Sequence, residues 1–200
     1  DGALWIADFY RLVLEHPEWI PDDVEQRLKL RSGSDRGRLY RVYPTKSTPR
    51  DIPKLSNKTI PELVAALESS NGWKRDTAQQ ILVNQNDPSA VTHLEELLRE
   101  TKNPKALLHA LYALDGINKI RPNHLIIGLT NSHPGVREHA IRLSENLFKK
   151  NEVDPIEEAL NQLVKDSNLR VRTQIAFSLG EWKSPAAGKL LVKLARDCSE

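Results

Sequence analysis

Apolar residues recur at helical spacing through the last three-quarters of the chain, and a proline stands just ahead of each of five such runs. Proline suits the first position of a helix, because the N–H that it lacks has no helical partner there. Thr59 and Glu62 have the spacing of a capping box before the first run. The pattern predicts five helices, which begin near Pro61, Pro88, Pro122, Pro155 and Pro185.

A second set of helices is predicted between these, and each follows a turn that opens on a polar residue. The four openers recur every 30 to 35 residues, at Ser69, Thr101, Asn131 and Asp166. Two helices per such period are typical of an α-solenoid, in which neighbouring helix pairs bury each other's apolar faces. Valine–arginine pairs at residues 136–137 and 171–172 make the turns resemble HEAT repeats. We therefore predict a right-handed α-α superhelix of about four and a half HEAT-like repeats over residues 55–200.

Residues 1–54 follow a different pattern, with two short alternating runs that predict strands. The first run lies within Asp1–Asp8 and the second spans Gly37–Tyr43, while Pro21–Leu30 between them predicts one short helix. We expect a small β-hairpin or loop segment here. Two strands alone are not stable in water, so they require further strands from outside these residues or packing on the first helices. We therefore interpret the chain as a piece of a longer protein, with residues 1–54 as the remnant of another domain.

Charge argues against a nucleic-acid partner, because 29 lysine and arginine residues nearly balance 27 aspartate and glutamate residues. The balance hides two unlike stretches: residues 1–25 hold seven acids and one base, and residues 27–50 hold eight bases and one acid. Tyr40 and Tyr43 lie in the basic stretch and could stack on the bases of a nucleic acid. The simpler interpretation is that the lysine and arginine side chains of this stretch pair with the carboxylates of residues 1–25. No apolar run approaches the ~18–20 residues that a membrane-spanning helix needs, so we expect no membrane insertion.

The sequence lacks the signatures of a catalytic or metal site. A single cysteine, Cys198, excludes an internal disulfide or a cysteine metal cluster, and we interpret it as an inert thiol. The six histidines lack metal-ligand spacing and are interpreted as surface or turn residues. No phosphate-binding loop, nucleophile elbow or paired-carboxylate signature occurs. We therefore predict no catalytic, cofactor-binding or metal-binding residues and no cofactor.

An arginine stands six residues after three of the four turn openers, at Arg75, Arg137 and Arg172. We favour a structural ladder, in which each arginine binds a polar or acidic turn residue of a neighbouring repeat. The alternative is a partner-binding role on the concave face. Trp73 and Trp182, at helix ends, join the arginines as candidates for either role.

Several segments resemble one family of large exported proteins, known as membrane-bound dehydrogenases or haem-binding proteins. Members resemble a sugar-dehydrogenase-like β-propeller followed by HEAT repeats and a cytochrome c domain. Asp1–Tyr10, Glu15–Pro21 and Gly33–Arg41 look like the last propeller blade, and Asn71–Ala78 and Pro134–Ala140 resemble the family's repeats. The resemblance implies a periplasmic or exported protein. No Cys-x-x-Cys-His haem motif occurs and most of the propeller is missing, so the family's redox activity does not carry over.

Two hypotheses about function follow. The first is a non-catalytic HEAT-repeat module that binds a protein partner or neighbouring domains of the same polypeptide, or spaces the domains of a larger exported redox protein. The second is part of a cytochrome-linked oxidoreductase, in which Asp8, Tyr10, Arg36 and Arg38 border the active site on the propeller side. An upstream propeller and a downstream haem motif would favour the second.

Overall fold

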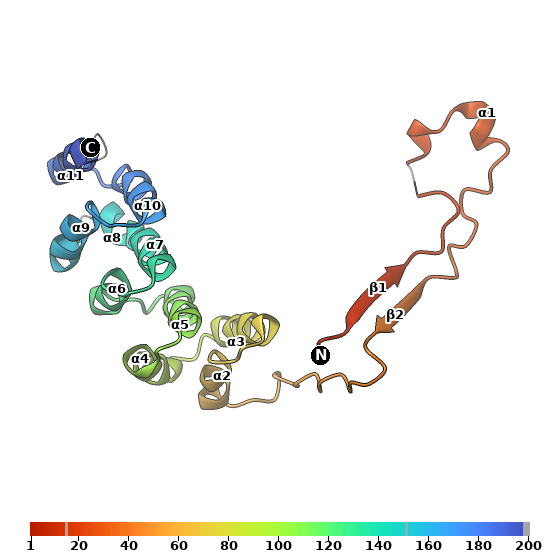
Figure 1. Cartoon of the computed structure of the whole chain (residues 1–200), viewed down its shortest axis with the longest axis horizontal. Helices are drawn as coiled ribbons and strands as arrows, with labels where there is room; N and C mark the ends of the chain where they lie inside the picture. Colours follow the sequence, from red (N-terminus) through yellow and green to blue (C-terminus); the bar gives the residue numbers. More distant parts are fainter. Residues whose placement is uncertain (15, 151, 198–200) are drawn as a thin grey trace. The chain divides into compact units, whose positions relative to one another are not determined.

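The computed structural model describes residues 1–14, 16–150 and 152–197. The chain divides into two compact units, residues 1–53 and residues 54–200 (Figure 1). Cys198 lies outside the described residues. None of the described helices is long and apolar enough to cross a membrane.

The first unit is built on two strands, as the alternating runs predicted. Strand β1 (Leu4–Asp8) pairs antiparallel with β2 (Arg38–Val42), with Leu4 opposite Val42 and Asp8 opposite Arg38. A 3-10 turn, η1 (Pro17–Trp19), and a short helix, α1 (Asp22–Glu25), lie in the connection. The helix predicted over Pro21–Leu30 is wrong in length. No residue of α1 is buried, so tertiary packing does not extend this isolated turn.

The second unit is a helical solenoid, which confirms the predicted fold class (Figure 1). We call the helices of its two layers the front helices and the second helices. The front helices are α2 (Ile60–Ala66), α4 (Ala90–Glu100), α6 (Pro122–Leu129), α9 (Glu157–Leu163) and α11 (Pro185–Asp197). The second helices are α3 (Gly72–Gln85), α5 (Pro104–Gly116), α7 (Pro134–Leu143) and α10 (Leu169–Leu179).

One hydrophobic core runs through the whole solenoid, from Leu55 to Leu194. Each second helix contacts the next one, and successive front helices contact each other in the same way as far as α9. Neighbouring repeats therefore share the apolar surface that none could bury alone. The predicted capping box is present, since the Thr59 N–H donates to the Glu62 carboxylate at 2.9 Å.

Two helix boundaries differ from the prolines and apolar runs that predicted them. Helix α4 begins at Ala90, because Asp87 accepts a hydrogen bond from the Ser89 N–H and holds Pro88 in a turn. The run from Val136 to Leu147 is broken into α7 and α8 (Glu145–Lys150). The buried Ser144 hydroxyl donates to the Ala140 carbonyl at 2.8 Å, a bond that often bends a helix. A 3-10 turn, η2 (Asp154–Ile156), then takes up Pro155 ahead of α9.

Candidate interaction surfaces

The turns before the second helices share one local geometry. At every turn the opener's side chain accepts a hydrogen bond from the backbone N–H two residues later, at 2.8 to 3.2 Å. This closes a small loop of the kind that serine, threonine, asparagine and aspartate favour. The polar openers are therefore explained by the turn itself. The pairs are Ser69 with Asn71, Thr101 with Asn103, Asn131 with His133, and Asp166 with Asn168.

The residue two places after the opener caps the second helix in three repeats. Asn103, His133 and Asn168 each accept from the backbone N–H two residues further on, at 3.0 to 3.1 Å. The sequence pattern did not lead us to predict this capping role. The signal was present, because asparagine, which suits an N-cap, stands two residues after three of the four openers.

The arginine six residues after the opener donates back to the opener's backbone carbonyl. Arg75 Nη1 lies 2.7 Å from the Ser69 oxygen, and Arg172 Nη1 lies 2.6 Å from the Asp166 oxygen. Arg137 Nη1 makes the same bond to Asn131 at 2.8 Å. In the remaining repeat Leu107 takes this position and is buried in the core. The six-residue spacing thus reflects a bond within each repeat.

Arg137 also reaches the next repeat. Its Nε lies 2.6 Å from Asp166 Oδ2 and its Nη2 lies 2.8 Å from Oδ1, a bidentate pair between side chains that are 14% and 6% exposed. Burial raises the pKa of the Asp166 carboxyl, but its hydrogen bonds to Arg137 and to the Asn168 N–H bring the pKa below its usual range. The Nε atoms of Arg75 and Arg172 are buried and have no hydrogen-bond partner among the described residues.

Histidines connect successive repeats at three further points. His109 Nδ1 lies 2.6 Å from Gln79 Oε1, and His139 Nδ1 lies 2.8 Å from the Tyr112 hydroxyl. His124 on α6 is 1% exposed, and its Nε2 lies 2.9 Å from the Glu95 carboxylate on α4. The interpretation of all six histidines as surface or turn residues was therefore wrong for His124.

The two tryptophan candidates differ in their surroundings. Trp182 is buried and stacks on Phe148, with ring centroids 5.7 Å apart and planes at 17°. Trp73, in the first turn of α3, is 52% exposed. Trp182 thus packs inside the solenoid, while Trp73 stands on its surface.

The second helices present one row of side chains at the same offset from each opener. The row lies eleven residues after the opener and comprises Gln80, Tyr112, Arg142 and Phe177, and we call it the second-helix row. Gln80 and Arg142 are exposed, Tyr112 is half-buried and Phe177 is 72% exposed. The second helices lie on the inner side of the curved array (Figure 1). This row offers polar, cationic and aromatic groups on a surface that the repeats extend.

In the first unit the acidic and basic stretches pair with each other. Arg38 Nη2 lies 2.8 Å from Asp8 Oδ2, and its guanidinium stands 4.3 Å from the Tyr10 ring centroid and 5.4 Å from that of Tyr40. The Tyr10 N–H and the Arg38 side chain hold the pKa of the Asp8 carboxyl below its usual range.

The opposite face of the strand pair repeats the arrangement. Arg41 Nη2 lies 2.9 Å from Asp1 Oδ2, and the Arg41 guanidinium stands 5.4 Å from the Trp5 ring centroid and 5.7 Å from that of Tyr43. Both strand arginines are thus paired with an aspartate and flanked by aromatic rings.

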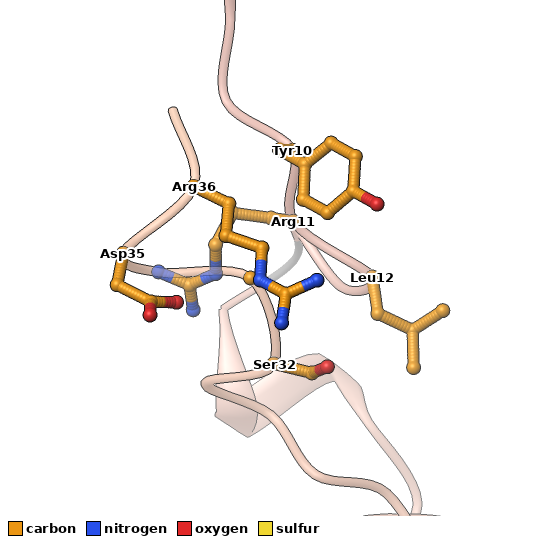
Figure 2. A pocket seen from close by; sticks show the side chains of 7 residues that line it. Tyr10, Arg11, Leu12, Ser32, Asp35 and Arg36 are labelled. Atoms are coloured by element: carbon orange, nitrogen blue, oxygen red, sulfur yellow. The ribbon is translucent and has the colours of Figure 1, made fainter. Parts of the chain in front are cut away.

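A hollow of about 520 Å³ lies between the segment that follows β1 and the segment that precedes β2 (Figure 2). Tyr10 and Arg36 line it, together with Arg11, Asp35 and the segment Ser32–Gly33. Gly33 has φ of +81°, and a Cβ there would lie 1.9 Å from the Tyr10 carbonyl oxygen. Of the four propeller-side candidates, Asp8, Tyr10 and Arg38 therefore lie together, and Arg36 shares the hollow with Tyr10. Within the described residues no three histidine, cysteine, aspartate or glutamate side chains gather to hold a metal ion.

Comparison with known proteins finds two family models along the chain. Residues 1–46 match a domain of unknown function, DUF7133, and residues 122–200 match HEAT repeats. The second unit contains a HEAT-repeat region. No curated protein matches the chain. Among solved structures, a crystal structure of an engineered protein is similar at 20% identity over 68% of each chain, with a TM-score of 0.40.

Proposed function

We propose that the chain is a non-catalytic HEAT-repeat module, whose solenoid binds a protein partner or neighbouring domains of its own polypeptide. The match to HEAT repeats carries the proposal, because stacked helical repeats commonly serve as extended protein-binding surfaces. The shared turn geometry supports it, since the same bonds recur in the repeats outside the matched residues.

The second-helix row is the surface that we assign to the partner. It combines an exposed arginine with aromatic side chains, the residue types that are enriched where proteins meet. Arg142 belongs to the row, and Lys105 stands seven residues before Tyr112, which places it on the same face of α5. Both side chains are exposed. A partner with acidic groups would complement them.

Charge-reversing substitutions on the second helices, with a control on a front helix, test whether the partner binds the second-helix row. We expect the double variant Lys105→Glu and Arg142→Glu to weaken binding of a purified partner or of the flanking domains at least tenfold, measured by calorimetry. The matched control is Arg99→Glu, an exposed arginine on front helix α4, which should bind as the unaltered chain does. Equal binding by both variants would reject the second-helix row, and a stoichiometric metal or cofactor absorbance in the purified chain would argue against a non-catalytic module.

We further propose that the parent protein is a larger exported redox protein, with residues 1–54 as the remnant of a propeller blade. The resemblance of Asp1–Tyr10 and Gly33–Arg41 supports this, together with the exposed apolar side chains on both faces of the strand pair. Sequencing the complete reading frame tests it. An upstream propeller and a downstream haem motif are the expected result.

The alternative is that the first unit borders an active site of that enzyme. The hollow lined by Tyr10 and Arg36 favours it, because Arg11 and Arg36 together would attract an anionic group. Asp8 and Arg38 neutralise each other and would position Tyr10 rather than bind substrate. If this alternative holds, Arg36→Gln in the whole enzyme should raise KM for an anionic substrate, while Arg27→Gln, an exposed control in the same unit, should leave it unchanged.

A further inference from the structure

The contacts between repeats define which positions of a second helix face the repeat that follows. Arg137 bonds Asp166, and Glu138 lies 3.5 Å from Arg170. Tyr112, eleven residues after its opener, bonds His139 of the next repeat. Positions six, seven and eleven after the opener therefore face forward. On α10, the last second helix within the described residues, these positions are Arg172, Thr173 and Phe177.

Arg172 is held in its repeat by the same bond as Arg137. In both, Nη1 donates to the opener's carbonyl, at 2.6 Å from Asp166 and 2.8 Å from Asn131. The remaining edge of the guanidinium, Nε with Nη2, is the edge through which Arg137 binds a carboxylate. In Arg172 the Nε is buried and has no partner within the described residues. A buried donor without an acceptor is costly, and a planar fork of this kind fits a carboxylate.

Arg75 shows what decides whether this edge is filled. Its Nε is also unpartnered, and the next turn opens on Thr101, which carries no carboxylate. The hydroxyl of Thr101 is hydrogen-bonded to Glu68 instead. The edge is filled only where the following turn opens on an acid, as at Asp166.

Phe177 marks the same face of α10. It is 72% exposed at the position where Tyr112 packs edge-on against the His139 ring, with centroids 5.6 Å apart. An aromatic side chain that points toward the following repeat is thus in place next to the unfilled arginine edge. The surface continues an established repeat interface beyond α10.

We propose that this face of α10 receives a further helix pair whose turn opens on aspartate or glutamate. The carboxylate accepts from Nε and Nη2 of Arg172, and the helix that follows covers Phe177. The occupant is recognised by its acidic opener and by an apolar or aromatic residue eight places later, where His139 stands in its own repeat. The proposal rests on repeat geometry and uses only Phe177 of the second-helix row, whereas the partner-binding test changes Lys105 and Arg142, so either can fail alone.

The experiment extends the chain with a copy of its own residues 166–197, joined after Glu200, in which the copied Gln174 is changed by Gln174→Leu so that an apolar residue stands eight places after the opener. The copied aspartate then stands 29 residues after Arg172, which is the separation of Asp166 from Arg137. A second extension carries asparagine in place of the copied aspartate. Each extension is made once with Arg172 and once with Arg172→Gln in the original α10. Urea unfolding gives the folding equilibrium constant of the four proteins.

We expect the aspartate to favour folding about tenfold over asparagine when Arg172 is present, and less than twofold in Arg172→Gln. Phe177→Ala should also weaken the extension, whereas Arg142→Gln should leave the aspartate effect unchanged. An equal aspartate effect with and without Arg172 would overturn the proposal. Amide exchange that shows the added helices to be unfolded would also overturn the proposal. The unextended chain is the reference, because it shows which amides are protected without the added helices.

Discussion

Arg137 fastens two repeats with one side chain, through carbonyls of its own turn and the buried carboxylate of Asp166. Arg137→Ala removes these bonds and leaves the Asp166 carboxylate, at 6% exposure, without its bidentate partner. We expect the free energy of unfolding to fall by about 3 kcal/mol, measured by urea denaturation. Arg142→Ala, an exposed change on the same helix, should stay within about 0.5 kcal/mol. Unchanged stability with lost partner binding would instead favour a binding role for the ladder.

The buried His124 and the half-buried His109 are expected to make the solenoid sensitive to acid. His124 Nδ1 accepts from the Arg121 N–H, which leaves Nε2–H to donate to Glu95. Burial lowers the pKa of His124, although Glu95 opposes the shift, and burial likewise lowers the pKa of His109. Below an unfolded pKa of about 6.5 the unfolded chain therefore binds more protons than the folded chain. The stability that neutral histidines provide is present above that pH and is lost as the pH falls.

We expect urea midpoints to decrease between pH 7.5 and pH 5.5, and to decrease less in a variant that combines His109→Gln with His124→Gln. The matched control is His93→Gln, a half-buried histidine on α4 that makes no side-chain hydrogen bond within the described residues. A pH profile that is the same in the double variant and in the unaltered chain would contradict the assignment.

At the scale of helices, glycine sets how closely α6 and α7 approach. A Cβ on Gly128 would lie 2.7 Å from the Ala140 Cβ and 3.0 Å from Leu111 Cδ1, whereas a Cβ on Gly188 of α11 would meet no atom within 4 Å. Gly128→Ala should lower the free energy of unfolding by about 1–3 kcal/mol, because overpacking outweighs the better helix propensity. Gly188→Ala should raise it by about 0.5–1 kcal/mol. Thermal unfolding of both variants measures this, and a stabilised Gly128→Ala would show that the helices can move apart.

The helices also show which features the sequence could predict. The ladder spacing was visible because each arginine bonds its own turn six residues away, a contact that any repeat carries in its local sequence. The pair of Arg137 and Asp166 spans 29 residues and depends on the stacking of two repeats. The burial of His124 was missed for the same reason, since its partner Glu95 belongs to another helix. The break at Ser144 depends on one hydroxyl inside an otherwise continuous apolar pattern.

At the scale of the whole chain, the two units bury their apolar residues very differently. The solenoid has a continuous core, but the first unit leaves Leu4, Trp5, Phe9 and Leu39 among its exposed apolar side chains. The strand arginines Arg38 and Arg41 are paired with aspartates and flanked by aromatic rings. They therefore present no unpaired charge that would keep another apolar surface from packing on these faces. Apolar surface of this extent is usual where a protein meets another surface.

We therefore expect the chain to self-associate through residues 1–53 when no other surface covers them. Sedimentation equilibrium should show an average mass that grows with protein concentration. The double variant Phe9→Lys and Leu39→Lys should have a lower average mass, because both side chains are about 70% exposed and lysine there would oppose association. Val192→Lys on α11, 53% exposed in the solenoid, is the matched control and should not change the mass. A chain that stays monomeric at every concentration would mean that the exposed apolar faces do not drive association, and it would count against the expectation that further strands cover them.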